Sequence, residues 1–238
     1  MPDNTVVVSA ETIIQIRRFS SCDVSVADAL IKLHHPNGGY LPDINLQTGA
    51  GHDFKLCGPA FTVQMVPASD TESPHLAQHF VDAGEKNTVM VISSPKNSKN
   101  AVWGGLMTAR AKVRGIKGVV IDGRGHSILG QSTFTRPSRI QVPITIHPAM
   151  NAESNLECDP EIKTLEGKQN LRSFPPTTVN PYDIILGDED GVVVIPHQEI
   201  DQVLDICTRN TRVDQQCLEA LKAGHNIADT FLQFRGKP

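Results

Sequence analysis

The stretch from residue 100 to residue 130, NAVWGGLMTARAKVRGIKGVVIDGRGHSILG, constrains the fold of this chain more than any other segment. Its apolar residues first recur every three to four positions, as they do on one face of a helix: Leu106, Ala109 and Val113. Gly115 ends this pattern, and the β-branched run at 118–122 that follows predicts a buried strand. A loop, a helix, a turn and a buried strand in this order indicate an α/β fold.

Two parts of this stretch are candidate ligand-binding segments. Ligands of open α/β sheets bind beyond the carboxyl ends of the strands, and the loop after this strand contains the candidate catalytic residues Asp122, Arg124, His126 and Ser127. The first backbone N–H groups of a helix have no partner within the helix and bind carboxylate or phosphate groups. The candidate substrate-binding residues are therefore those around the predicted helix start: Gly104, Gly105, Leu106 and Met107.

The same stretch resembles the RraA-like family, which includes 4-hydroxy-4-methyl-2-oxoglutarate aldolases and RNase E inhibitor proteins. The family pattern is Trp-Gly-x-Leu, a helix, and then Ile-Asp-Gly-x-x-Arg-Asp. The chain is similar to it at 102–107 (VWGGLM) and 120–123 (VIDG), and further similar segments are VSVADAL at 24–30, GPAFTV at 58–63 and DEDGVVVIP at 188–196. The resemblance extends from about Ser20 to Pro196. It implies an RraA-like swivelling β/β/α domain in a ring-shaped homotrimer or homohexamer, with sites between subunits.

The chain departs from the family at the two residues that carry the family's chemistry. The Arg-Asp pair of the pattern falls on His126 and Ser127. The resemblance implies a role for each residue of this pair in the aldolases. The Asp helps to hold a divalent metal, and the Arg binds the carboxylate of the keto acid. A serine hydroxyl is a poor replacement for a carboxylate at a hard cation, and an imidazole lacks the two-point grip of a guanidinium. Arg124 lies two positions before the place of the family's Arg, so we do not expect its side chain to replace that residue. The sequence therefore predicts that the scaffold is kept without a metal or another cofactor.

We accordingly expect a repurposed, metal-independent enzyme acting on a small carboxylate-bearing intermediate of terpenoid or polyketide type. In this hypothesis His126, with an unperturbed pKa of about 6.5, serves as acid, base or hydrogen-bond donor. Ser127 donates a hydrogen bond, Arg124 supplies charge and Asp122 orients the loop. Without a Lewis acid for an enolate, the favoured reactions need mainly shape and a few hydrogen bonds: cyclisation, including pericyclic (Diels–Alder type) cyclisation, isomerisation or elimination. Secondary-metabolite biosynthesis in a microbial, fungal cell is a setting suggested by analogy alone.

Two alternatives stay open. The first is a divalent-metal-dependent aldolase or oxaloacetate decarboxylase using Mg²⁺ or Mn²⁺, in which Asp122, His126 or an acidic residue at 188–190 supplies the missing ligand. The second is a non-catalytic binding or regulatory protein, like the family's RNase E inhibitors. For the acidic turn we favour a structural role, because Asp190-Gly191 is typical of a hairpin.

Length, charge and composition indicate in which cellular compartment the protein works and which classes of partner it binds. A chain of 238 residues can bury one substantial core, so we predict a single domain over 1–238 with a helical tail at about 198–232. A net charge of −4 argues against a nucleic-acid binder driven by phosphate contacts. Apolar runs fall short of the roughly 20 residues that span a bilayer, and the start lacks signal-peptide features. Five scattered cysteines indicate reduced thiols. We expect a cytoplasmic protein with a small-molecule substrate and neither nucleic acid nor membrane as partner.

Periodicity and turn residues predict the remaining elements. They are two helical pieces within 1–35, a polar loop with three histidines at 34–53, strands at 57–66 and 88–92, a helix at 73–83, a strand at 141–147, a long loop at 148–176 and a strand pair within 180–196.

Overall fold

The computed structural model describes residues 8–22, 26–47, 54–96, 98–125, 134–148 and 175–236. His126 and Ser127 lie outside these ranges, as do His52 and most of the predicted loop at 148–176. The helices are α1 (Ala10–Ile16), α2 (Val26–Lys32), η1 (Pro36–Gly39), α3 (Phe80–Ala83), α4 (Gly105–Arg114), η4 (His197–Glu199), α6 (Ile200–Lys222) and α7 (Ile227–Arg235). The strands are β1 (Leu56–Pro67), β2 (Val89–Ser93), β3 (Gly118–Asp122), β4 (Thr135–Ile140), β5 (Ile144–Ile146), β6 (Thr177–Val179), β7 (Ile184–Gly187) and β8 (Val192–Ile195).

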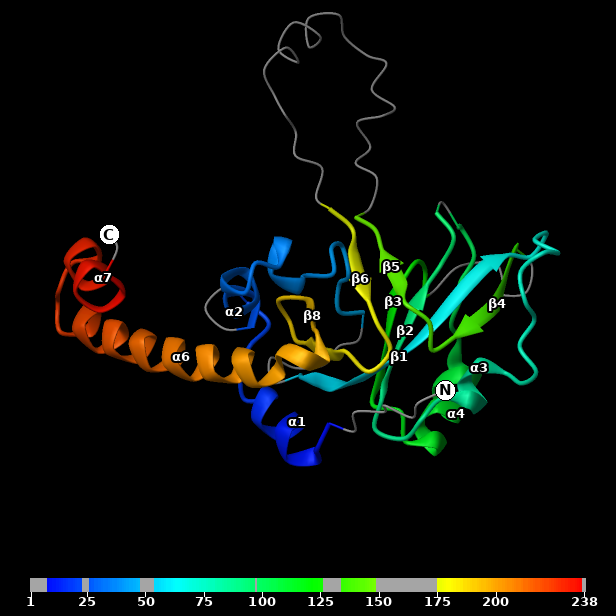
Figure 1. Cartoon of the computed structure of the whole chain (residues 1–238), viewed down its shortest axis with the longest axis horizontal. Coiled ribbons are helices and arrows are strands. Elements are labelled where there is room, and N and C mark those ends of the chain that lie inside the picture. The colour runs from blue at the N-terminus through cyan, green and yellow to red at the C-terminus, as the bar shows by residue number, and fades with distance from the viewer. Residues whose placement is uncertain are drawn as a thin grey trace, which may run out of the picture.

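A mixed six-stranded sheet forms the centre of the molecule (Figure 1). Its order is β3-β2-β1-β7-β8, and β4 pairs with β1 as well. The pairs β1–β2 and β2–β3 are parallel, whereas β7 and β4 run antiparallel to β1. The twelve-residue β1 is long enough to pair with β7 through its first half and with β2 and β4 further along. The α/β class is confirmed, and β5 and β6 form a separate antiparallel pair.

Three apolar clusters pack the helices and the β5–β6 pair against the central sheet. One joins α1, α2 and α6 to β7 and β8 through residues such as Leu30, Ile184 and Val203. A second lies between the sheet and the β5–β6 pair, and a third packs α3 and α4 on β1 and β2 around Phe61 and Phe80. The central parallel strand β2 is buried because clusters lie on both of its faces, which explains its apolar sequence.

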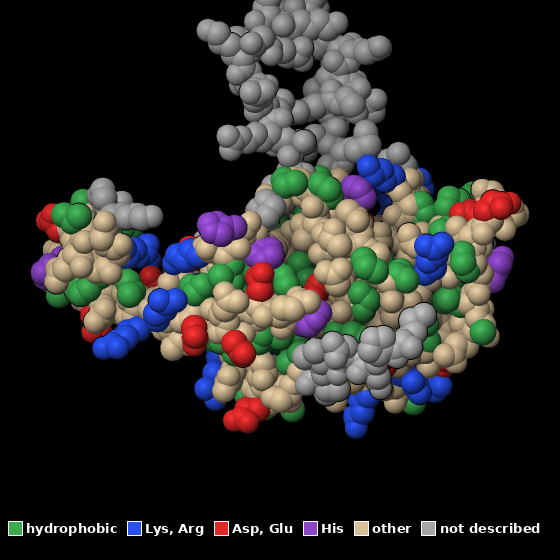
Figure 2. Space-filling model, viewed as in Figure 1, with side chains coloured by type: hydrophobic (Ala, Val, Ile, Leu, Met, Phe, Trp, Pro, Cys, Tyr) green, Lys and Arg blue, Asp and Glu red, His purple; other side chains and the backbone are tan. Residues whose placement is uncertain are grey.

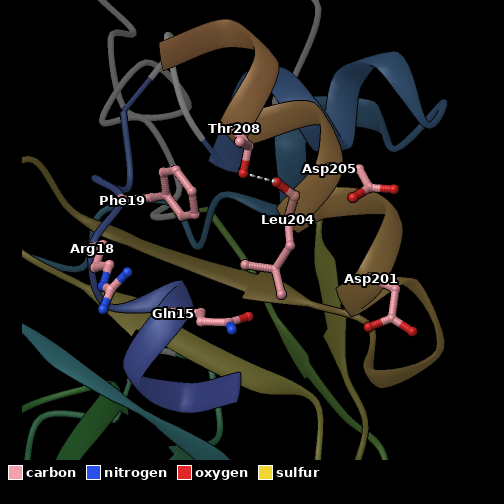
Figure 3. Close-up of a pocket in the computed structure, with 7 residues that line it drawn as sticks. All are labelled: Gln15, Arg18, Phe19, Asp201, Leu204, Asp205 and Thr208. Carbon is pink, nitrogen blue, oxygen red and sulfur yellow. Dashed lines mark hydrogen bonds between the residues drawn. The ribbon is translucent and has the colours of Figure 1, made fainter. Parts of the chain in front are cut away.

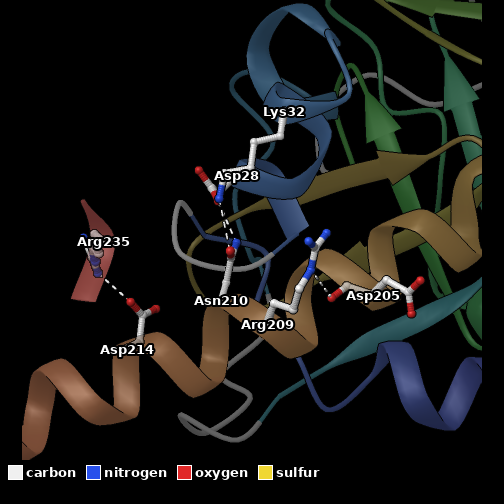
Figure 4. Close-up of polar contacts among 7 residues, drawn as sticks. All are labelled: Asp28, Lys32, Asp205, Arg209, Asn210, Asp214 and Arg235. Atoms are coloured by element: carbon white, nitrogen blue, oxygen red, sulfur yellow. Dashed lines mark hydrogen bonds and ion pairs between the residues drawn. The ribbon is translucent and has the colours of Figure 1, made fainter. Parts of the chain in front are cut away.

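The long helix α6 extends away from the body of the molecule, and the last helix, α7, lies near its far end (Figure 1). Its first half is anchored by the buried Val203 and Cys207. Figure 4 shows how polar contacts continue this attachment: the Asn210 side chain donates to Asp28 of α2 at 2.7 Å. Farther out, Arg235 of α7 pairs with an aspartate of α6. The two helices occupy the stretch where the sequence predicts a helical tail.

The predicted helix at 73–83 is wrong, because only Phe80–Ala83 is helical. The preceding residues form a loop whose carbonyl groups are bound by one side chain. The Arg136 guanidinium donates to the backbone oxygens of Asp70, Ser73 and Pro74. Arg136 comes from β4, a strand that the sequence analysis did not predict.

The apolar spacing in α4 predicts the helix correctly but not its buried face. Leu106 is 90% exposed and Val113 77% exposed, and Ala109 is exposed as well. The side that packs on the sheet contains Ala111 instead. In α1 the aliphatic Ile14 is likewise 58% exposed. Among the described helices, none is both long and apolar enough to cross a membrane.

Candidate functional site

The loop after β3 and the loop before α4 lie side by side. The Val102 N–H donates to the Arg124 carbonyl at 2.9 Å, and Ala101 forms a parallel bridge with Arg124. On the other side, the Ser94 N–H donates to the Asp122 carbonyl at 3.0 Å. The carboxyl ends of β2 and β3 and the start of α4 therefore meet at one edge of the sheet, where the sequence predicts ligand binding.

The amino-terminus of α4 is an uncapped helix start. Its N-cap residue, Gly104, offers no side-chain hydrogen bond, and the first intrahelical bond runs from the Thr108 N–H to the Gly104 carbonyl. A Cβ atom built on Gly104 or Gly105 would meet nothing within 4 Å, so the space beside both residues is open. The Trp103 indole N–H binds the Thr108 hydroxyl at 2.9 Å. The resulting helix start can accept an anion without first displacing a capping side chain.

Asp122 is the titratable group of this site with a perturbed pKa. The half-buried carboxyl lies at the end of β3 and accepts a 3.4 Å hydrogen bond from the His147 backbone N–H. Burial raises the pKa of Asp122, while His147 and the Lys96 ammonium act in the opposite direction with smaller effect. A carboxyl with a raised pKa is a stronger base when ionised than an ordinary carboxylate, which suits it to proton transfer.

The end of β5 closes the site from a third side. The Ser93 hydroxyl donates to the Thr145 carbonyl at 3.1 Å, which places His147 next to the ends of β2 and β3. Gly123 has φ +150°, and a Cβ atom there would lie 2.5 Å from the Ser94 Oγ. That Ser94 Oγ is buried and has no hydrogen-bond partner among the described residues.

The structure thus places Asp122 at the end of β3 and residues 104–107 at the start of α4, in segments that the contact between Val102 and Arg124 joins, and the Arg124 side chain is exposed. His126 and Ser127 lie outside the described residues, so their roles stay predictions. Sequence reasoning missed His147 as a neighbour of Asp122. Its only signal was its position at the end of the alternating segment 141–147, which does not reveal that β5 returns to β3.

The described donor atoms do not make a preassembled metal site. In the described ranges there is no group of three or more His, Cys, Asp or Glu residues that could hold a metal ion. At the sheet edge Asp122 brings one carboxylate, accompanied by serine hydroxyls. Mg²⁺ prefers six oxygen ligands in octahedral geometry, of which carboxylates are the strongest. Mg²⁺ in proteins is usually bound through one or two carboxylates and keeps several waters, so among the described residues Asp122 is the one that would hold the divalent ion that the family resemblance implies.

The acidic turn at 188–190 has a structural task instead. Asp188 is buried and accepts hydrogen bonds from the Ser21 N–H at 2.8 Å and from the Ser21 hydroxyl. It also accepts one from the Asp190 N–H at 3.2 Å. These bonds tie the segment before α2 to the β7–β8 hairpin, in line with the structural role predicted for this turn.

A polar groove of about 500 Å³ lies away from Asp122, between α1 and α6. Figure 3 shows Gln15, Arg18 and Phe19 on its α1 side, facing residues of α6 that include Asp201 and Leu204. Figure 2 shows acidic and basic side chains interspersed over the face in view. We define the candidate site by the hydrogen bonds and the burial at the sheet edge around Asp122, and not by this groove.

A family model described as Aldolase/RraA, RraA-like, matches residues 23–194, which is more than half of the chain. The chain belongs to the RraA-like family. The matched range contains β1 to β3, α4 and Asp122, so every described part of the candidate site lies within the RraA-like region.

Two curated relatives are similar at the sequence level. Protein DlpA of Legionella pneumophila is 26% identical over 177 residues, which are 73% of this chain and 27% of DlpA. A putative 4-hydroxy-4-methyl-2-oxoglutarate aldolase of Halalkalibacterium halodurans is 29% identical over 162 residues, 68% of this chain and 69% of that protein. The chain therefore spans about a quarter of DlpA and about two thirds of the aldolase.

Solved structures share the fold. An uncharacterized protein from Pseudomonas syringae superposes with a TM-score of 0.71 at 21% identity, covering 98% of this chain and 99% of that one. Streptomyces coelicolor RraAS2, described as an unusual member of the RNase ES inhibitor RraA protein family, has a TM-score of 0.61 at 18% identity and covers 87% and 96% of the two chains. At these identities the likeness concerns the fold alone, and it confirms the predicted RraA-like α/β architecture.

Proposed function

We propose that this RraA-like chain is a repurposed enzyme that acts, without a metal, on a small carboxylate-bearing organic molecule. The observation that carries the proposal is the half-buried Asp122 carboxyl, whose pKa burial raises, beside an uncapped helix start. Both belong to the sheet edge where the loop after β3 and the loop before α4 run side by side. In this proposal a substrate bound across the edge places its carboxylate at the α4 N–H groups and its reacting carbon at Asp122.

In this proposal the N–H groups of Gly105, Leu106 and Met107 bind the substrate carboxylate. Such bonds are charge-assisted and roughly twice as strong as neutral ones. The ionised Asp122 takes a proton from a carbon conjugated with that carboxylate, and the helix start stabilises the charge that moves toward it. Return of the proton to another carbon completes an isomerisation, and loss of a leaving group completes an elimination. His126, Ser127 and Arg124 remain candidates for orienting the substrate.

A cyclisation is the third reaction that this arrangement supports. A pericyclic ring closure needs no proton exchange, so the pocket would act by holding one reactive conformation and by polarising the carboxylate through the α4 amides. A terpenoid- or polyketide-like intermediate would suit such a reaction. Dependence of turnover on Asp122 separates the classes, because proton transfer requires its carboxyl and ring closure does not.

The relative named a putative 4-hydroxy-4-methyl-2-oxoglutarate aldolase favours a second candidate function. In a metal-dependent aldolase Asp122 would supply the carboxylate for the ion, and waters would complete the coordination. A non-catalytic binding protein would keep the anion site at α4 and show no dependence of any turnover on Asp122.

The anion site can be tested with a matched pair of variants at Gly105. Proline is well tolerated at the first position of a helix and lacks the N–H, and the extended Gly104 (φ −156°, ψ 173°) suits a residue that precedes proline. Gly105→Ala keeps the N–H and adds a Cβ into open space. We expect Gly105→Pro to weaken binding of pyruvate to chelator-treated protein by roughly tenfold or more, and Gly105→Ala to leave it within about twofold. Calorimetry provides the measurement, and equal affinities of the two variants would contradict the proposal.

A further inference from the structure

A second groove, of about 630 Å³, lies at the opposite end of the parallel strands from Asp122. One wall is α1 and the segment before it, and the other contains the start of β1 and the turns that lead into β2 and β3. Because β1, β2 and β3 are parallel, their starts and their carboxyl ends lie at different edges of the sheet. The volume lies within the usual range for small-molecule sites.

The groove has an apolar interior. Its apolar lining comes from α1, the segment before it and β1: Val8, Ala10, Ile13, Ile14, Leu56 and Pro59. Ile14 is 58% exposed although it is a large aliphatic residue. The Cys57 thiol is also part of the lining, and burial raises its pKa to about 11 in spite of the nearby Arg17 and Lys55. The thiol is therefore neutral at physiological pH and adds no charge to the interior.

Four cationic side chains surround this interior: Arg17, Lys55, Lys86 and Lys117. The Lys55 ammonium is fixed by the Phe19 carbonyl at 2.6 Å. Within the described ranges the other three cations form no ion pair.

The lining contains one acidic residue, Glu85, and its carboxylate is already engaged. It accepts hydrogen bonds from the Tyr182 hydroxyl at 3.1 Å and from the Gln141 amide at 3.5 Å. Four cations against one anion give the lining a charge of +3, whereas the whole chain carries −4. A concentration of unpaired positive charge around an apolar recess favours a ligand that is anionic at one end and apolar along its body.

We propose that this groove binds a free amphipathic carboxylate, with its aliphatic body against Ile13 and Ile14 of α1 and its head group among Arg17 and the lysines. The site is independent of the proposed enzymatic function, because it shares no residue with the sheet edge around Asp122. A ligand here contacts both α1 and the strand starts, so binding would also stabilise the folded chain.

Calorimetric titration of the full chain with three ligands, two with a long alkyl tail and one without, tests both halves of the proposal. Decanoate has the tail and a negative head, decyltrimethylammonium has the tail and a positive head, and acetate has only the head. We expect decanoate to bind and the other two to bind at least about tenfold more weakly. Equal binding of decanoate and decyltrimethylammonium would overturn the charge assignment.

Two matched variant pairs locate the binding. Ile14→Asn changes an isoleucine of the groove that is 58% exposed, and Ile227→Asn changes one on α7 that is 61% exposed. Lys117→Glu reverses a charge in the groove, and Lys112→Glu does so on the exposed side of α4. We expect about a tenfold loss of decanoate affinity for the groove variants and less than about twofold for the controls. Losses of equal size within each pair would overturn the proposal.

Vesicles of phosphatidylglycerol provide the remaining comparison. Binding to these vesicles without binding to free decanoate would show that the basic groove contacts a membrane surface, and would overturn the proposal of a free ligand. Absence of decanoate binding to the folded wild-type chain would overturn it as well.

Discussion

At the scale of single residues, burial of the Asp122 carboxyl destabilises the folded chain and also suits the group to proton transfer. Its carboxyl is half-buried at the end of β3, and the raised pKa shows that the folded chain favours the protonated form more than the unfolded chain does. Nearby groups recover part of this cost, because the His147 N–H and the Lys96 charge favour the anion. Buried titratable groups that are only partly compensated are frequent at functional sites.

The raised pKa makes a prediction about stability. Below the unfolded pKa of about 3.9 both states are protonated and the group has no effect. As the pH rises above that value, the unfolded chain releases the proton first, and the free energy of unfolding falls until the pH passes the folded pKa. Asp122→Asn removes this loss, so we expect a Tm on the order of a few °C above wild type at pH 7 and a smaller difference near pH 4.

The measurement is thermal unfolding of both proteins from pH 4 to pH 8. Asp205→Asn, at an exposed position of α6, is the control and should follow the wild-type curve. A difference between Asp122→Asn and wild type that does not depend on pH would contradict this explanation.

The sequence was sufficient to predict that Asp122 ends a strand and that residues 104–107 begin a helix, because periodicity shows where strands end and helices start. It was not sufficient for His147, which reaches Asp122 through the return of β5 to the sheet edge. Contacts of this kind depend on tertiary topology rather than on local pattern. His126 and Ser127 remain predictions from the departure that they make from the family pattern.

At the scale of elements, the β7–β8 hairpin shows how an acidic turn supports the fold. Asp188 accepts bonds from Ser21 and Asp190, and its side chain is buried. Asp188→Ala would leave the Ser21 N–H and hydroxyl without this acceptor. We expect a loss of about 2–3 kcal/mol in the free energy of unfolding, measured with urea. The neighbouring exposed Asp190→Ala should change it by less than about 0.5 kcal/mol; similar losses in both variants would contradict the assigned role.

Secondary structure was predictable where pattern and burial agree. The strands β2, β7 and β8 have nearly continuous apolar sequences because both of their faces are covered. β4 was missed because Arg136, Pro137 and Arg139 interrupt its apolar residues, yet Arg136 is the residue that binds the 70–74 loop. The predicted helix at 73–83 failed for the same reason, since the stabilising partner is distant in sequence.

At the scale of the whole molecule, the exposed apolar residues of α4 indicate a surface that the isolated chain leaves uncovered. Leu106 and Val113 lie on the outer side of the helix that begins at the candidate site. The family resemblance implies a ring-shaped trimer or hexamer, in which a neighbouring subunit would cover such residues. Burying Leu106 would also place that neighbour close to Gly104 at the start of α4.

This assembly can be tested by light scattering after size-exclusion chromatography. We expect a mass of three or six times the 25.9 kDa of the chain. Leu106→Glu with Val113→Glu should shift the population toward the single chain, because each charge would be buried without a partner. Leu232→Glu, at a 58% exposed position of α7, should not. A wild-type mass of one chain would contradict the expected ring.

The central claim is that an RraA-like scaffold here binds and converts a carboxylate-bearing molecule without a divalent metal. The most direct measurement is calorimetric titration of chelator-treated protein with Mg²⁺ and Mn²⁺, with oxaloacetate decarboxylation followed in the same samples. We predict no metal binding and no decarboxylation by a folded protein that still binds pyruvate. Metal binding accompanied by turnover would contradict the claim and would assign the chain to the metal-dependent aldolases.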